Sequence, residues 1–195
     1  MAAGASAQSP GLYYIEPGKS RIEVHVYRAG FLGDNHWVVL KRFSGSAESP
    51  DGKSWKVHVV AEAGSLRVMD PGSSAGTRAE IQRTMLGPKQ LDVTRFLRIT
   101  LDSQSLKPGP SPGTWRMIAT LTLHGVSRQE DYLISWQQKG KELDARGQKE
   151  LRLTDFQIKP IRLAFGAIRV KNEFDVNFDV TLEREPPSTV GHAAR

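Results

Sequence analysis

Apolar and polar residues alternate strictly over residues 173–182, near the end of the chain. Five apolar residues alternate here with charged residues, Asn177 and Thr181. The apolar ones are Phe174, Val176, Phe178, Val180 and Leu182. Successive side chains of a β-strand point to opposite faces, so this segment has one apolar and one polar face. The pattern predicts an antiparallel strand that is buried on one side and solvated on the other.

The same period recurs along most of the chain. Further alternating runs cover residues 22–26, 55–62, 115–123 and 132–136, and turn-forming segments separate them at residues 50–52, 107–113 and 139–141. Pro, Gly and Asp at these positions are typical of tight turns between sequential strands. We therefore predict an all-β, up-and-down antiparallel meander that closes into a barrel or packs as a sandwich.

One segment departs from this alternating pattern. In residues 77–86, Ile81 and Met85 are spaced to share one face of a helix, and Gly87-Pro88 follows them as a stop. Ser73 or Ser74 can cap the start. We predict one short amphipathic helix over about residues 76–87, packed on the barrel or across its mouth.

Composition indicates one globular domain. The chain has 195 residues, of which 38% are hydrophobic, and 27 Lys and Arg against 21 Asp and Glu give a net charge of +6. We expect disordered ends over residues 1–11 and 185–195 and a single domain over 12–184. The basic residues are spread out, which argues against nucleic-acid binding but suits contact with an anionic membrane surface.

The chain lacks several features that would define other classes of protein. It has no cysteine, and no apolar run reaches the roughly 20 residues of a membrane-spanning helix. Residues 1–10 have no hydrophobic stretch of the kind found in signal peptides. The sequence also contains no nucleophile elbow, phosphate-binding glycine loop or His-Glu-x-x-His motif, so we expect a binding protein rather than an enzyme.

Four segments in order resemble the YceI-like family of lipocalin-like barrels. They are residues 14–20 (YIEPGKS), 76–100 (with GTR, MLGPKQLD and FLRIT), 121–128 (LTLHGVSR) and 153–158 (LTDFQI). The resemblance implies an eight-stranded antiparallel barrel that encloses an isoprenoid or another lipid-like chain. It also implies a periplasmic or secreted protein, and we keep a homodimer as one oligomeric option.

The chain departs from the family pattern at three positions. Gln157 and Leu97 stand where the family usually has Gly and Pro, and Asp34 stands where one branch carries the first histidine of a Gly-His-Asn/Asp-His segment. Ligands of other branches therefore do not transfer automatically to this chain.

Large apolar residues on the strands are the candidates for lining a cavity. They are Trp37, Phe43, Met117, Trp136, Phe165, Phe174 and Phe178. A barrel of about eight strands either fills its interior with such side chains or holds one small ligand. With the family resemblance we favour an apolar cavity with a bound lipid, and we expect no other cofactor.

Histidines are the candidates for polar chemistry. His25 and His58 alternate with apolar residues, and His192 lies near the end of the chain, so we expect all three to be solvated. Asp34 and His36 are two residues apart, so in an extended segment their side chains share one side and can approach one cation. His124 precedes Gly125 and is either part of that site or a structural residue of the turn. The alternative function is a metal- or cofactor-dependent redox accessory, or a stress-related envelope protein, that uses the Asp34/His36 loop.

Overall fold

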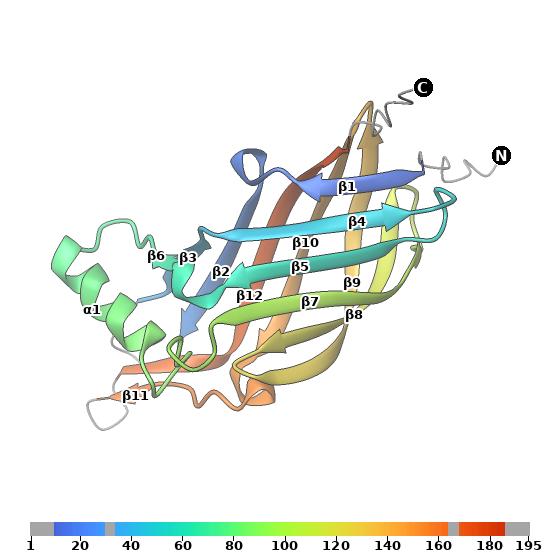
Figure 1. Cartoon of the computed structure of the whole chain (residues 1–195). Helices are drawn as coiled ribbons and strands as arrows, with labels where there is room; N and C mark the ends of the chain where they lie inside the picture. Colours follow the sequence, from blue (N-terminus) through green and yellow to red (C-terminus); the bar gives the residue numbers. More distant parts are fainter. Residues whose placement is uncertain (1–9, 30–33, 164–167, 186–195) are drawn as a thin grey trace, which may run out of the picture.

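A closed, antiparallel, eight-stranded β-barrel forms the body of the molecule, as the resemblance predicted (Figure 1). The computed structural model describes residues 10–29, 34–163 and 168–185. Five barrel positions are single or nearly continuous strands: β7 (Arg98–Pro108), β8 (Thr114–Leu123), β9 (Val126–Lys139), β10 (Glu142–Arg152) and β12 (Ile168–Arg184). Sequential pairing of β7 to β10, followed by β12, gives the predicted meander. A short strand, β11 (Arg162–Leu163), pairs with the start of β12.

The other three barrel positions are each interrupted. β1 (Gly11–Ile15) and β2 (Arg21–Arg28) flank a 3-10 turn, η1 (Pro17–Lys19). β3 (His36–Leu40) runs into β4 (Phe43–Ser49), and β5 (Lys56–Glu62) runs through η2 (Ala63–Ser65) into β6 (Leu66–Val68). β1 pairs with both β4 and β12, which closes the barrel, while β2, β3 and β6 extend the sheet at the other end. β1 begins at Gly11, inside the segment expected to be a disordered tail, while residues 1–9 and 186–195 lie outside the described residues.

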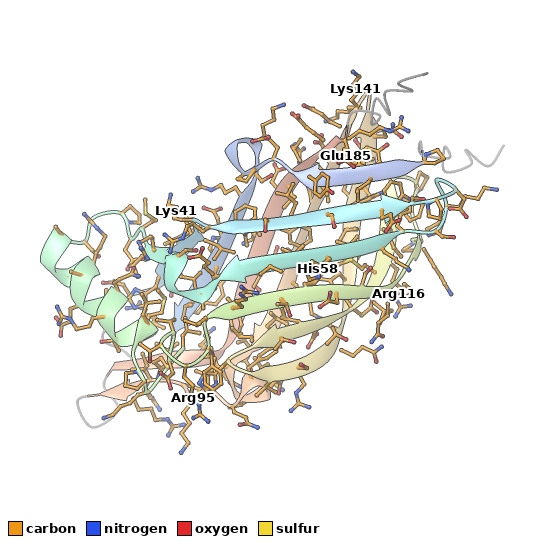
Figure 2. The ribbon with its side chains drawn as sticks, in the orientation of Figure 1. Lys41, His58, Arg95, Arg116, Lys141 and Glu185 are labelled. Atoms are coloured by element: carbon orange, nitrogen blue, oxygen red, sulfur yellow. The ribbon has the colours of Figure 1, made fainter. Side chains whose placement is uncertain are left out.

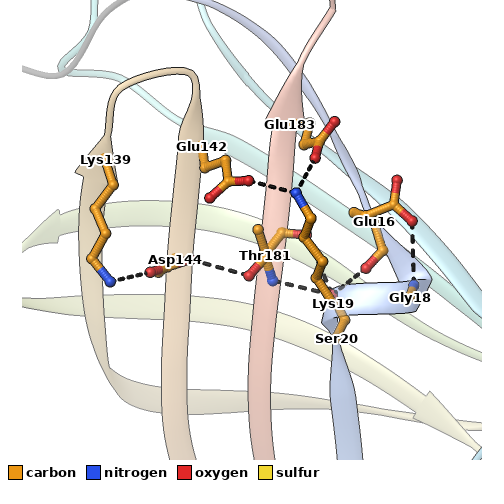
Figure 3. A network of polar contacts seen from close by, with 9 residues as sticks. All are labelled: Glu16, Gly18, Lys19, Ser20, Lys139, Glu142, Asp144, Thr181 and Glu183. Carbon is orange, nitrogen blue, oxygen red and sulfur yellow. Dashed lines mark hydrogen bonds and ion pairs between the residues drawn. The ribbon is translucent and has the colours of Figure 1, made fainter.

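Side-chain hydrogen bonds bridge the break between β1 and β2 (Figure 3). Ser20 Oγ donates to the carbonyl of Glu16 at 2.7 Å and accepts from the amide of Thr181 on β12 at 3.1 Å. Thr181 Oγ in turn donates to Asp144 on β10 at 3.1 Å. Because η1 interrupts the strand, part of the backbone of β12 has no neighbouring strand there. These side chains supply hydrogen bonds in its place.

The helix α1 (Ala75–Leu86) lies beside β6 at one end of the barrel (Figure 1). Its bounds differ by one residue at each end from the predicted 76–87, and Ser74 is the cap, accepting from the amide of Thr77 at 3.1 Å. Ile81 and Met85 pack against the main core, as their spacing predicted. Within the described residues, no helix is long and apolar enough to cross a membrane.

Aromatic side chains fill the opposite end of the barrel. The rings of Tyr13 and Trp55 lie 5.7 Å apart, and Trp55 contacts Trp136 edge-on at 5.2 Å. All three side chains are buried. They stand near the turns that join β4 to β5 and β9 to β10, away from α1, so we call them the aromatic plug. On the outside of the wall, polar side chains such as His58 and Arg116 project into solvent (Figure 2).

Candidate functional site

An interior cavity of about 560 Å³ extends from the aromatic plug to α1. Apolar side chains from every wall of the barrel line it, including Val24, Val59, Leu101, Met117 and Phe178. The inward-facing members of the alternating strands supply this lining, since every second residue of a strand faces the same side. The volume falls within the range of about 300–1,000 Å³ that is usual for small-molecule sites.

The structure places four of the seven residues proposed as cavity-lining residues at the cavity. Met117, Trp136, Phe174 and Phe178 line it. Phe43 is buried in the core cluster but is not part of the lining. Phe165 lies outside the described residues.

Trp37 is on the outer face of the barrel and does not line the cavity. Its side chain is 44% exposed, and its ring contacts that of His25 with centroids 3.7 Å apart. The neighbouring Val38 and Leu40, together with His36, do line the interior or its mouth. The sequence prediction was wrong here because Trp37, Val38, Val39 and Leu40 are all apolar, so alternation could not say which set faces inward.

A histidine–carboxylate pair lies at the α1 end of the cavity. His36 Nδ1 is 2.7 Å from Asp70 Oδ2, and Asp70 Oδ1 accepts from the amide of Trp37 at 2.7 Å. The register of β3 and β6 pairs Val38 with Val68 and Leu40 with Leu66. His36 and Asp70 are the next pair on the same face, which is why two residues 34 positions apart meet. Asp70 is only 3% exposed, and its Oδ1 atom accepts a hydrogen bond from a backbone amide.

Asp70 is a site residue that sequence reasoning missed. Asp70 comes just after β6 and belongs to no recognisable sequence motif. Only the pairing of β3 with β6 brings it to His36. Asp34 lines the mouth of the cavity and is exposed. Among the residues that the structure describes, no cluster of three or more His, Asp or Glu side chains could hold a metal ion.

His124 has a structural position away from this mouth. His124 and Gly125 form the two-residue turn between β8 and β9, with φ of 52° and 73°. His124 Nδ1 lies 3.1 Å from the carbonyl oxygen of Phe156 in η3 (Leu153–Phe156), and its ring contacts Phe96 at 4.3 Å. The structure therefore does not bring His124 together with Asp34 and His36; it ties the turn to the segment that follows β10.

Tyr132 is one of the residues that line the cavity. Burial raises the pKa of Tyr132 above its ordinary value, and the nearby Glu130 carboxylate adds to the rise. The phenol is therefore neutral at physiological pH. It lines the cavity without adding a charge.

Comparison with known proteins agrees with this architecture. The sequence matches the YceI-like domain over residues 13–182. The chain belongs to the YceI-like family. The resemblance deduced from the four segments between residues 14 and 158 is thereby confirmed, and no curated protein sequence matches the chain.

Solved structures of similar fold are distant in sequence from this YceI-like chain. BcnA of Burkholderia cenocepacia has a TM-score of 0.69 at 15% identity, with 86% of this chain and 98% of that chain covered. A polyisoprenoid binding domain from Saccharophagus degradans, implicated in plant cell wall breakdown, has 0.65 at 11%, covering 91% and 100%. The YCEI protein of Campylobacter jejuni has 0.61 at 11%, covering 76% and 85%. At these identities the likeness establishes the fold.

Proposed function

We propose that this YceI-like barrel binds one apolar chain, such as an isoprenoid, quinone-like or fatty acyl chain, in its interior and so stores or carries it. The observation that carries the proposal is the cavity of about 560 Å³ between the aromatic plug and α1, with its lining drawn mainly from Val, Leu, Ile, Met and Phe. The neighbouring structure that is described as a polyisoprenoid binding domain supports the same assignment.

Burial of hydrocarbon is enough to drive such binding. Each methylene that leaves water contributes about 0.8 kcal/mol, so a five-carbon isoprene unit contributes roughly 3–4 kcal/mol before the costs of ordering. Two or three units inside the cavity therefore reach useful affinity without a special polar residue.

Filling the cavity with a protein side chain tests the proposal. Val59 on β5 lines the cavity, whereas its neighbour Val60 is not part of the lining. We expect Val59→Trp to reduce binding of farnesene, a headless fifteen-carbon hydrocarbon, at least tenfold. Val60→Trp adds the same ring to the other face of the same strand and should leave binding within about twofold.

The measurement is quenching of intrinsic tryptophan fluorescence by farnesene, with bound mass checked by native mass spectrometry and folding checked by thermal unfolding. Equal binding by the two variants, with both folded, contradicts an interior site. Failure of the wild-type protein to take up farnesene or any other apolar chain contradicts the proposed function itself.

We also propose that the α1 end of the barrel contacts the membrane surface from which a lipid would be taken. Two adjacent exposed apolar residues, Trp37 and Met69, lie there, and Leu97 is exposed before β7. In sedimentation with vesicles, Trp37→Ser/Met69→Ser should bind less than wild type, and Leu133→Ser, which removes an exposed leucine from β9, should not. Equal sedimentation of all three would contradict this contact.

A periplasmic or secreted location stays a prediction, to be checked by cell fractionation.

A further inference from the structure

Most polar residues of the cavity lining lie at the α1 end, while Ser46 and Tyr132 line it from the middle of β4 and β9. Thr77, Glu80 and Thr84 of α1 contribute to the lining at the α1 end, as do Asp34 and His36. The walls between this rim and the aromatic plug are mainly apolar. An amphipathic ligand would therefore place its hydrocarbon chain toward the plug and its polar headgroup at the rim.

Apart from His36, the ionisable side chains of the cavity lining at the rim are acidic. Asp34 and Glu80 line it, and Asp70 stands behind His36. Among the described residues that line the cavity there is no Lys or Arg. Arg78 of α1 is directed to the carbonyl oxygen of Ser73, and Lys159 and Arg162 are exposed and outside the lining. Like charges repel, and although water reduces the repulsion at the exposed positions of Asp34 and Glu80, the repulsion still disfavours phosphate, diphosphate and carboxylate headgroups.

His36 is the group at the rim whose hydrogen-bonding role the structure defines. A carboxylate only accepts hydrogen bonds, so the contact at 2.7 Å requires a proton on His36 Nδ1. In the neutral ring, Nε2 then carries a lone pair. No partner for Nε2 is present among the described residues, and the side chain lines the cavity. With the ring neutral, the pair presents one oriented acceptor to whatever occupies the mouth.

We infer that the barrel selects an apolar chain with an uncharged, hydroxyl-bearing headgroup, such as a prenol, phenol or quinol, whose hydroxyl donates to His36 Nε2. This inference rests on the proposed function and narrows it to one class of ligand. Asp70 is a positioning residue, because it sets the orientation and tautomer of His36 without reaching the ligand.

Three ligands that share the same fifteen-carbon chain test which headgroup the barrel prefers. They are farnesene, farnesol and farnesyl diphosphate. We expect wild-type protein to bind farnesol at least tenfold more tightly than farnesyl diphosphate. Added salt should strengthen diphosphate binding, because it screens repulsion. Diphosphate binding that equals or exceeds that of farnesol, and that weakens with salt, would overturn the inference.

Substitution of His36 tests the acceptor. His36→Phe should weaken farnesol binding roughly 3- to 10-fold, the effect of one net hydrogen bond, and leave farnesene within about twofold. His58→Phe is a matched control, because His58 pairs with Asp102 at 2.5 Å on the outer face of β5. Unchanged farnesol binding by folded His36→Phe would overturn the role of His36.

Asp70→Asn tests the positioning role. The asparagine oxygen can keep the amide of Trp37, and its NH₂ group then donates to His36 Nδ1 and moves the ring proton to Nε2. Farnesal, whose aldehyde only accepts, should therefore gain at least threefold relative to farnesol in this variant. An unchanged farnesal-to-farnesol ratio contradicts the tautomer assignment. Throughout, loss of farnesene binding would mark failure of the proposed function, whereas intact farnesene binding with no headgroup selectivity would mark failure of this inference alone.

Discussion

At the scale of single residues, the turn between β8 and β9 shows how tightly one position can be constrained. Gly125 has a φ of 73°, and a Cβ built on it would lie 2.5 Å from the ring of Phe96. His124 takes positive φ as well, which is typical of a two-residue hairpin turn. Two separate costs, backbone strain and a steric clash, therefore fall on any side chain at residue 125.

Substitution of Gly125 can separate these two costs. Gly72 has a φ of 83° and open space around the Cβ position, so Gly72→Ala carries the backbone strain alone, about 1 kcal/mol. We expect Gly125→Ala to lower the free energy of unfolding by a further 1–3 kcal/mol or so, because Phe96 must move. Urea unfolding of both variants measures the difference. Equal losses would show that Phe96 does not constrain this turn.

Asp51 makes folding stability depend on pH. Its carboxylate accepts from the amides of Ser54 at 2.7 Å and Lys53 at 2.8 Å, and these bonds lower the pKa of Asp51 to about 2. A carboxyl group whose pKa is lower in the folded state stabilises the fold above its ordinary pKa of about 4, and that stabilisation is lost as pH falls toward 2.

We therefore expect Asp51→Asn to lower the unfolding temperature at pH 7 and to flatten its fall between pH 5 and 2.5. Glu48→Gln, which neutralises an exposed carboxyl group on β4, is the control. The melting temperature across this pH range is the measurement. A parallel curve for Asp51→Asn and wild type would contradict the assigned role.

Residue-level prediction from sequence succeeded where local chemistry decides the outcome. The turn at Pro50-Asp51-Gly52 and the cap at Ser74 follow from residues that are adjacent in sequence. Gln157 was recognised as a departure from a family glycine, and its φ of 60° explains why glycine suits that position. Asp70 could not be predicted as a partner of His36, because their contact depends on the register of strands that are far apart in sequence.

At the scale of elements, one polar side chain, that of Gln82, adds to the apolar packing that holds α1 on the barrel. β6 pairs with β3 on one side only, so its other edge exposes backbone groups. Gln82 of α1 satisfies two of them: its amide nitrogen donates to the carbonyl of Leu66 at 2.6 Å, and its oxygen accepts from the amide of Val68 at 2.8 Å. The helix thereby covers the edge of β6 that faces away from β3.

We expect Gln82→Ala to lower the free energy of unfolding by about 1–3 kcal/mol, since two backbone groups lose their partners. The exposed neighbour Arg83→Ala should change it by less than about 0.5 kcal/mol. Hydrogen exchange at the amide of Val68 should accelerate in the first variant only. Unchanged exchange at Val68 would show that Gln82 does not hold α1 on this edge.

Alternation predicted several strands but neither β4 nor β10, and it did not predict where strands are interrupted. The segments at residues 55–62, 115–123 and 173–182 form strands, because one face of each is apolar. The breaks between β1 and β2 and between β5 and β6 depend on how β1 closes the barrel and how β6 pairs with β3. Those are properties of the whole sheet.

At the scale of the whole molecule, the distribution of aromatic residues decides whether the barrel is filled or hollow. Tyr13, Trp55 and Trp136 gather at one end and close it, while mainly aliphatic side chains such as Val24 and Val59 line the rest. The sequence identified aromatic residues but not where they gather, so it left both a filled and a hollow barrel open. The cavity follows from their segregation.

The most direct test of the account is a crystal structure of the protein grown with farnesol. The account predicts density for a fifteen-carbon chain inside the barrel, with its tail toward Trp136 and its hydroxyl within hydrogen-bonding distance of His36 Nε2. An interior that stays empty or water-filled at saturating farnesol, or a farnesol molecule bound only on the outer surface, would contradict it.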